Sequence, residues 1–285
     1  MDSKLKSASR PVDEKGKQYH IQVAPGEVAR YVLLPGDPER VPWIASFWDK
    51  AWPVAKHREY VTYSGYYKNV FISATSTGIG APATAIAVEE LARVGANTLI
   101  RVGTTGALRK DIGVGDIIIS TGAVRLEGTS KQYVPPEYPA VASYEVVLAL
   151  IEAAESIGVR YHVGLTASSD SFYVGQERPG FRDYMPPFQR GLISFLREIN
   201  VLNFEMEASL IFTLANIYGL RAGAVCAAIA NRETEEFVIN AGVEDAIKVA
   251  NEAVRILHEW DEAKERRGKK YFYPSLLSFL RDELR

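Results

Sequence analysis

Short apolar runs bounded by glycine, proline and polar residues alternate along the chain with segments of helical periodicity. The runs predict strands at residues 31–34, 69–74, 98–102, 117–120, 161–167, 201–204 and 222–230. Apolar positions three and four residues apart predict helices at residues 81–94, 144–157, 188–199, 205–218, 243–266 and 274–284. Strand, glycine-containing turn, helix and strand follow one another over residues 69–102, which is the order of a parallel βαβ unit.

This alternation continues to the end of the chain without a recognisable linker. It favours one α/β domain with a central mixed β-sheet flanked by helices. Residues 1–17 are polar and rich in lysine, so we expect a flexible N-terminal segment there. The domain itself is expected to span residues 18–285, with a C-terminal extension beginning at about residue 264.

Composition narrows the class of protein. The 285 residues are 47% hydrophobic and 24% charged, which is ordinary for a globular chain. The formal net charge of -2 gives no global field that would attract nucleic acid or a membrane surface. The single cysteine, Cys226, excludes a disulfide framework and a cysteine zinc site. The polar N-terminus has no secretory leader and no apolar run is long enough to span a membrane, so we expect a cytoplasmic protein.

One polar motif interrupts the apolar run at residues 98–102. Arg101 lies within this run, and Gly103, Thr104 and Gly106 follow it in a predicted loop. A buried arginine is costly unless an anion or a carboxylate pairs with it. Glycine and threonine supply backbone and hydroxyl donors at the same place. The motif therefore fits an oxyanion such as phosphate, although a salt-bridged arginine beside a turn is an equally simple interpretation.

Three other strand ends carry polar groups. Gly36 and Arg40 lie where a strand gives way to a helix N-terminus, which attracts anions. Gln176 and Arg178 follow a third strand, and Glu207 follows a fourth. Ligands of open α/β sheets bind at the carboxyl ends of strands. A phosphate-like site beside a carboxylate and an amide-bearing loop suggests a sugar joined to a base.

Four motifs together resemble the nucleoside phosphorylase-I family. They are Pro35-Gly-Asp-Pro-Glu-Arg40, Arg101-Val-Gly-Thr-Thr-Gly106, Ser169-Asp-Ser-Phe-Tyr-Val-Gly-Gln-Glu-Arg178 and Asn203-Phe-Glu-Met-Glu-Ala208. The first two are shared across that family, and the third resembles the base loop of its pyrimidine-specific members. The resemblance covers residues 18–262, in order.

The resemblance implies roles for fourteen residues. The phosphate would be held by Gly36, Arg40, Arg58, Arg101 and Thr104. The ribose would be held by His20, Met206 and Glu207. The base would be held by Gly106, Phe172, Gln176, Arg178, Ile229 and Ala230. The groups implied to act in catalysis are Arg101, Gln176, Arg178 and Glu207.

The implied reaction is the reversible phosphorolysis of uridine to uracil and α-ribose 1-phosphate, with inversion at C1′. Gln176 and Arg178 would stabilise the charge that develops on the leaving pyrimidine. The ribose would become oxocarbenium-like, and phosphate fixed by arginines would be both nucleophile and counter-charge. No side-chain nucleophile and no cofactor are needed, and phosphate is a co-substrate.

Two comparisons with that family favour a pyrimidine phosphorylase. Purine-selective members place an aspartate after the strand that ends near residue 230, where this chain has Asn231 and Arg232. Hydrolytic members lack the phosphate arginines, whereas Arg40, Arg58 and Arg101 are all present here. A purine nucleoside phosphorylase, a nucleosidase, a non-catalytic nucleoside-binding protein and a purely structural oligomer are the alternatives. The choice between uridine, thymidine and deoxyuridine stays open.

The resemblance also implies an assembly. His20 and Arg58 would act in a neighbouring subunit's site, in a homo-hexamer arranged as a trimer of dimers. Some members bind a monovalent cation between subunits through a glutamate, an isoleucine and a serine. Glu59 and Ile79 match the first two, but Ala83 stands at the serine position, so we expect no metal site.

Overall fold

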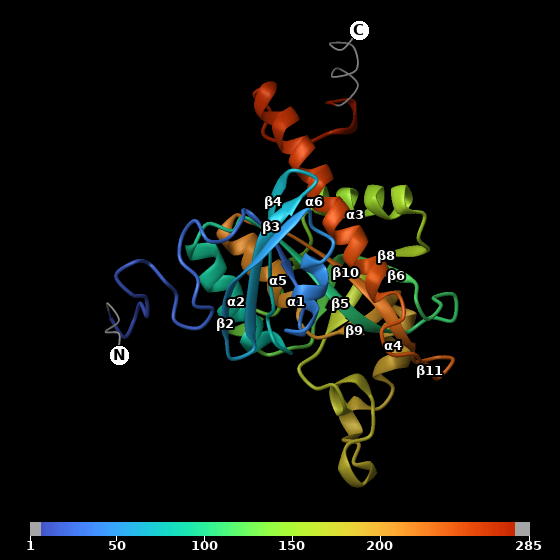
Figure 1. The fold of residues 1–285 in the computed structure, drawn as a ribbon. Helices are drawn as coiled ribbons and strands as arrows, with labels where there is room; N and C mark the ends of the chain where they lie inside the picture. The colour runs from blue at the N-terminus through green and yellow to red at the C-terminus, as the bar shows by residue number, and fades with distance from the viewer. Residues whose placement is uncertain (1–6, 277–285) are drawn as a thin grey trace.

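The computed structural model describes residues 7–276 (Figure 1). Its strands are β1 (Tyr31–Leu34), β2 (Lys50–His57), β3 (Tyr60–Tyr67), β4 (Val70–Thr75), β5 (Thr98–Ala107), β6 (Ile117–Arg125), β7 (Ala140–Val141), β8 (Tyr161–Ser168), β9 (Val201–Glu205), β10 (Arg221–Asn231) and β11 (Glu236–Phe237). Its α-helices are α1 (Arg40–Ala45), α2 (Ala81–Arg93), α3 (Tyr144–Ile157), α4 (Leu192–Glu198), α5 (Ala208–Tyr218) and α6 (Val243–Arg266).

The strands form one mixed sheet that partly closes on itself. Its order is β11-β10-β6-β8-β9-β5-β1-β4-β3-β2, and β7 pairs with β6. Because β10 also pairs with β5, the strands β5, β9, β8, β6 and β10 make a ring. β1 lies parallel to both β4 and β5, so the unit β4-α2-β5 is the parallel crossover that the sequence predicts.

Helices cover both faces of the sheet (Figure 1). α1, α3 and α6 share one hydrophobic core with the sheet, and α2 and α5 share another on the opposite face. α6 buries one stripe that includes Ile247, Val254 and Leu257, as expected for an amphipathic helix whose other face is exposed to solvent. α5 is buried along most of its length, because it lies between the sheet and α2. The prediction of a single α/β fold with a mixed sheet is confirmed.

Three predicted boundaries are wrong by four residues or more. The strand expected to end at residue 120 continues to Arg125 as β6. The strand expected to end at residue 102 continues to Ala107 as β5, because its glycines and threonines pair with β10 as far as Asn231. The helix expected over residues 188–199 is broken: a 3-10 turn covers Pro187–Gln189, and α4 begins only at Leu192. Gly191 between them has φ 82°. This left-handed conformation, which glycine adopts readily, interrupts the helix between the 3-10 turn and α4.

The segment after α6 packs on the domain. The ring of Phe272 stacks on that of Trp260, with ring centroids 3.8 Å apart. A 3-10 turn covers Pro274–Leu276, and Leu276 is buried. The rest of the helix expected over residues 274–284 lies outside the described residues.

At the other end of the chain, Val12 forms an antiparallel bridge with Gln18, within the stretch for which the sequence predicts flexibility. Over residues 7–276, no helix is both long and apolar enough to cross a membrane.

Candidate active site

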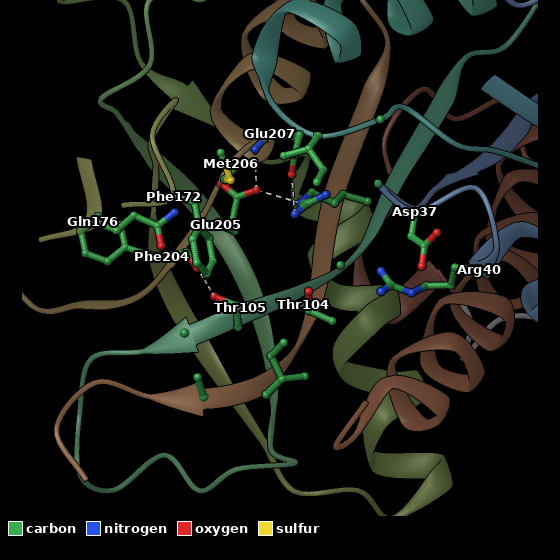
Figure 2. Close-up of a pocket in the computed structure, with 18 of the residues that line it drawn as sticks. Asp37, Arg40, Thr104, Thr105, Phe172, Gln176, Phe204, Glu205, Met206 and Glu207 are labelled. Carbon is green, nitrogen blue, oxygen red and sulfur yellow. Dashed lines mark hydrogen bonds and ion pairs between the residues drawn. The ribbon is translucent and has the colours of Figure 1, made fainter. Parts of the chain in front are cut away.

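A cavity of about 630 Å³ opens where β1, β5, β9 and β10 end. Figure 2 shows Asp37 and Arg40 at one end of it, and Phe172 and Gln176 at the other. Met206 and Glu207 project between these ends. The cavity therefore lies at the carboxyl edge of the sheet, where the sequence places its polar motifs.

Twelve of the fourteen residues predicted from the sequence line this cavity. They are Gly36, Arg40, Arg101, Thr104, Gly106, Phe172, Gln176, Arg178, Met206, Glu207, Ile229 and Ala230. His20 and Arg58 do not line it. Residues from five separate stretches of chain thus meet in one hollow.

Arg101 lines the cavity and lies between two carboxylates. Its Nε is 2.8 Å from Oε2 of Glu205, and its Nη2 is 2.5 Å from Oε2 of Glu207. All three side chains are buried. Burial by itself would lower the pKa of Arg101, but the charges of Glu207 and Glu205 outweigh burial and raise it. Burial raises the pKa of Glu207, and the charge of Arg101 opposes that effect.

Local backbone structure holds this trio. A Cβ at Gly103 would lie 2.8 Å from Cζ of Arg101 and 2.9 Å from Sγ of Cys226, so a larger residue there would displace the guanidinium. Glu205 accepts hydrogen bonds from the backbone N–H groups of Glu207 and Ala208 at 2.7 and 2.8 Å. Its carboxylate thereby caps the positive end of α5, as anions do at helix N-termini.

Arg40 provides a second guanidinium, at the end of the cavity where Asp37 lies (Figure 2). It is the first residue of α1, and its Nη1 donates to the carbonyl of Val102 at 3.3 Å. Burial lowers the pKa of Arg40, and nearby Arg101 adds to that effect. Two cations that converge beside Thr104 and Gly36 make a place suited to an oxyanion.

The opposite end is built from the loop after β8. Nη1 of Arg178 donates to Oε1 of Gln176 at 2.5 Å and to the carbonyl of Phe172 at 2.9 Å. The guanidinium lies 4.1 Å from the centre of the Phe172 ring. Arg232 donates to the carbonyls of Gln176 and Glu177 at 2.8 and 3.3 Å. Burial and the charge of Arg232 lower the pKa of Arg178 to about 10.

Sequence reasoning missed several groups here. Glu205 precedes Glu207 by two residues. A second carboxylate beside Glu207 was the signal that could have identified Glu205 as another partner of the buried arginine. Arg232 holds the loop after β8 from the end of β10 and follows Asn231 directly. Phe237, in the short β11, also lines the cavity, but nothing in its sequence context marks it.

Asn231 does not line the cavity. Its Nδ2 donates to the carbonyls of Arg109 and Ile112, and its Oδ1 accepts from the N–H of Glu233. The side chain therefore fixes the turn after β10 instead of facing a bound base.

His20 and Arg58 lie together outside the cavity. The hairpin between β2 and β3 turns at Arg58, so Glu59 lines the cavity while exposed Arg58 points towards the ring of Tyr19, 5.9 Å away. Nδ1 of His57 is 2.8 Å from the carbonyl oxygen of His20. Two residues predicted to act in a neighbour's site thus share one patch of this chain's surface.

Acidic, histidine and cysteine side chains could bind a metal ion where several of them are grouped together. Among residues 7–276, no group of three or more His, Cys, Asp or Glu side chains is placed to hold a metal ion. Glu59 and Ile79 line the cavity, and Ala83 brings no hydroxyl.

Comparisons with known proteins agree with this geometry. The Phosphorylase superfamily model matches residues 30–259. The uridine phosphorylase of Thermococcus kodakarensis is 64% identical over 276 residues, which cover 97% of this chain and 99% of that protein. The uridine phosphorylase of Escherichia coli is 41% identical over 251 residues, covering 85% and 99%. The guanosine phosphorylase of Halorubrum lacusprofundi is 43% identical over 210 residues, covering 74% and 82%.

Proposed function

The chain belongs to the phosphorylase superfamily, and we propose that it is a uridine phosphorylase, a pentosyltransferase that moves the ribose of uridine to inorganic phosphate. One observation carries the proposal. A single cavity has converging arginines at one end, an amide and a third arginine at the other, and a carboxylate between them. That order of groups along the cavity suits phosphate at one end, a pyrimidine at the other and the ribose that links them.

At the phosphate end, Arg40, Arg101 and Thr104 would hold the dianion, with the backbone N–H of Gly36 beside them. Fixed in this place, phosphate is a nucleophile aimed at C1′ and a counter-charge for an oxocarbenium-like transition state. In-line attack from one face of the ribose inverts C1′ and yields α-ribose 1-phosphate. No covalent enzyme intermediate is required, and phosphate is the only co-substrate in this scheme.

At the base end, Gln176 would match one edge of uracil, and Arg178 would oppose the negative charge that develops on the leaving ring. Donors that strengthen as charge develops lower the barrier more than donors that bind substrate and transition state equally. Arg232 would keep this pair in place. Between the ends, Glu207 would accept hydrogen bonds from the ribose hydroxyls, and Met206 would pack on the sugar.

The site would be completed by a second subunit. His20 and Arg58 are outside the cavity of their own chain but lie in one patch, as expected if both are supplied to a neighbour. Arg58 would add a cation at the phosphate, and His20 would contact the 5′-hydroxyl. We propose a homo-hexamer of the trimer-of-dimers kind on this basis.

The competing substrates are purine nucleosides, since a relative named guanosine phosphorylase is 43% identical to this chain. The test is kcat/KM for uridine, inosine and guanosine at saturating phosphate. We expect uridine to be preferred by about 100-fold or more, because a base site with polar groups left unpaired rejects the wrong ligand strongly. Preference for inosine or guanosine would contradict the assignment of the base loop to uracil.

A further inference from the structure

A buried carboxylate beneath residues 19–23, called the N-terminal arm from here on, has no part in the scheme above. Glu90, on α2, is 3% exposed. In the described residues its one ion-pairing partner is a histidine, not a lysine or an arginine. A buried carboxylate is costly unless its oxygens accept hydrogen bonds, so the donors around it indicate what it holds.

Those donors all come from the arm. Oε2 of Glu90 accepts from the backbone N–H of His20 at 3.0 Å and from that of Ile21 at 2.8 Å. Oε1 is 2.7 Å from the ring Nδ1 of His20. The backbone and the ring of His20 are thus held by the same side chain. The carbonyl of His20 is bonded separately, to Nδ1 of His57 at 2.8 Å.

These contacts decide which ring nitrogen of His20 is exposed to a ligand. An ionised carboxylate can only accept, so Nδ1 of His20 must carry the proton in this contact. In the neutral imidazole, Nε2 is then the acceptor. The side chain of His20 is 25% exposed, and no hydrogen-bond partner of Nε2 is found within residues 7–276.

We propose that Glu90 is a positioning residue for His20. It fixes the Nδ1-protonated tautomer and presents Nε2 as an acceptor for the 5′-hydroxyl of a nucleoside bound by the neighbouring subunit. The inference rests on the shared site proposed above. It adds a requirement that the shared site alone does not contain, since a histidine in the opposite tautomer could not accept that proton at Nε2.

The test compares Glu90→Gln with the parent enzyme on uridine and on 5′-deoxyuridine, which lacks the 5′-hydroxyl. The amide keeps one acceptor for the arm, but its NH₂ group can donate to Nδ1 and favour the other tautomer. We expect kcat/KM for uridine to fall about tenfold, the value of one hydrogen bond, and kcat/KM for 5′-deoxyuridine to stay unchanged. Glu90→Gln added to His20→Ala should have no further effect.

Glu89→Gln is the matched control. Glu89 is the preceding residue of α2, and its carboxylate contacts Arg93 at 3.1 Å and the hydroxyl of Tyr218 at 2.6 Å instead of the arm. It should leave both substrates unaffected. ¹⁵N NMR of the His20 ring, assigned by its loss in His20→Ala, should report a protonated Nδ1 in the parent and a change of tautomer in Glu90→Gln.

Four outcomes would overturn the inference. Equal losses on both substrates would mean that Glu90 only anchors the arm, and no loss on either would remove its role. If His20→Ala discriminates between the substrates while Glu90→Gln does not, only the inference fails. If His20→Ala does not discriminate either, the shared ribose site itself fails, and the inference fails with it.

Discussion

At the scale of single residues, the trio Glu205, Arg101 and Glu207 forms a buried charge cluster in the lining of the cavity. One guanidinium pairs with two buried carboxylates, at 2.8 and 2.5 Å. The planar fork of arginine can meet both at once, whereas the ammonium of lysine is a single point charge. Arg101 therefore links the proposed phosphate and ribose subsites physically, and a change at this position should disturb both.

We expect Arg101→Lys to lower kcat/KM for uridine about 10²–10³-fold, as removal of an oriented charge from an active site commonly does. Steady-state kinetics with each substrate varied will measure the loss, with circular dichroism to verify that the variant is folded. Arg109→Lys is the control, because Arg109 makes a half-exposed pair with Asp111 at 2.9 Å away from the cavity. A variant within a few-fold of the parent would contradict the central place of Arg101.

At the scale of elements, the sequence predicted most helices and strands but not where polar strands end. β5 runs on through Gly103 and Gly106 because its pairing with β10 is decided by the partner strand, which local propensity does not contain. The charged and amide-bearing cavity residues were found because they lie at predicted strand ends, whereas Phe172, Met206, Ile229 and Ala230 were identified only through the family resemblance. Arg232 and Phe237 were missed since they act through tertiary contacts of a turn and a two-residue strand.

A buried charge cluster joins α6 to the sheet. The carboxylate of Asp261 accepts from Nη2 of Arg221 at 2.6 Å and from the hydroxyl of Tyr31 at 2.6 Å, and Lys264 lies 2.9 Å away. Burial would raise the pKa of Asp261, but Arg221 and these other partners outweigh burial and lower it from 3.8 to about 2. Folding therefore favours the ionised form of this carboxyl.

The sign of the resulting pH dependence follows from linkage. A carboxyl with a depressed pKa stabilises the fold fully above about pH 4, and this contribution is lost as pH falls towards about 2. The shift corresponds to about 2 kcal/mol. Asp261→Asn should therefore unfold more easily than the parent at neutral pH, with the difference shrinking below pH 4 in thermal melts. Glu262→Gln, on the exposed side of α6, is the control, and a constant difference at all pH values would contradict this linkage.

At the scale of the whole molecule, the catalytic unit is proposed to be larger than one chain. Arg58 and His20 are the two predicted site residues that the fold leaves outside the cavity. The family motifs could identify these two residues as site residues. Their place in one surface patch means that they could reach only a ligand bound by a neighbouring subunit. The relation between subunits has no local signal in the sequence, so it could be inferred only from the resemblance.

Arg58→Ala should weaken phosphate binding while leaving the chain folded, because Arg58 is exposed and its guanidinium lies over the ring of Tyr19 at the surface. Phosphate saturation kinetics should give a higher KM for phosphate, and Lys56→Ala on the same hairpin should not. Co-assembly of Arg58→Ala subunits with Arg101→Lys subunits should regain activity, since some mixed sites have both arginines intact. Unchanged affinity for phosphate in Arg58→Ala would contradict the proposal that Arg58 completes a neighbouring subunit's site.

The most direct measurement is uracil release from uridine with and without inorganic phosphate, with the ribose product identified in the same reaction. The account predicts release only when phosphate is present, and α-ribose 1-phosphate in an amount equal to the uracil. Release of uracil and free ribose without phosphate would make the protein a hydrolase. That result would contradict the proposed phosphate-binding role of Arg40 and Arg101, which is the central claim.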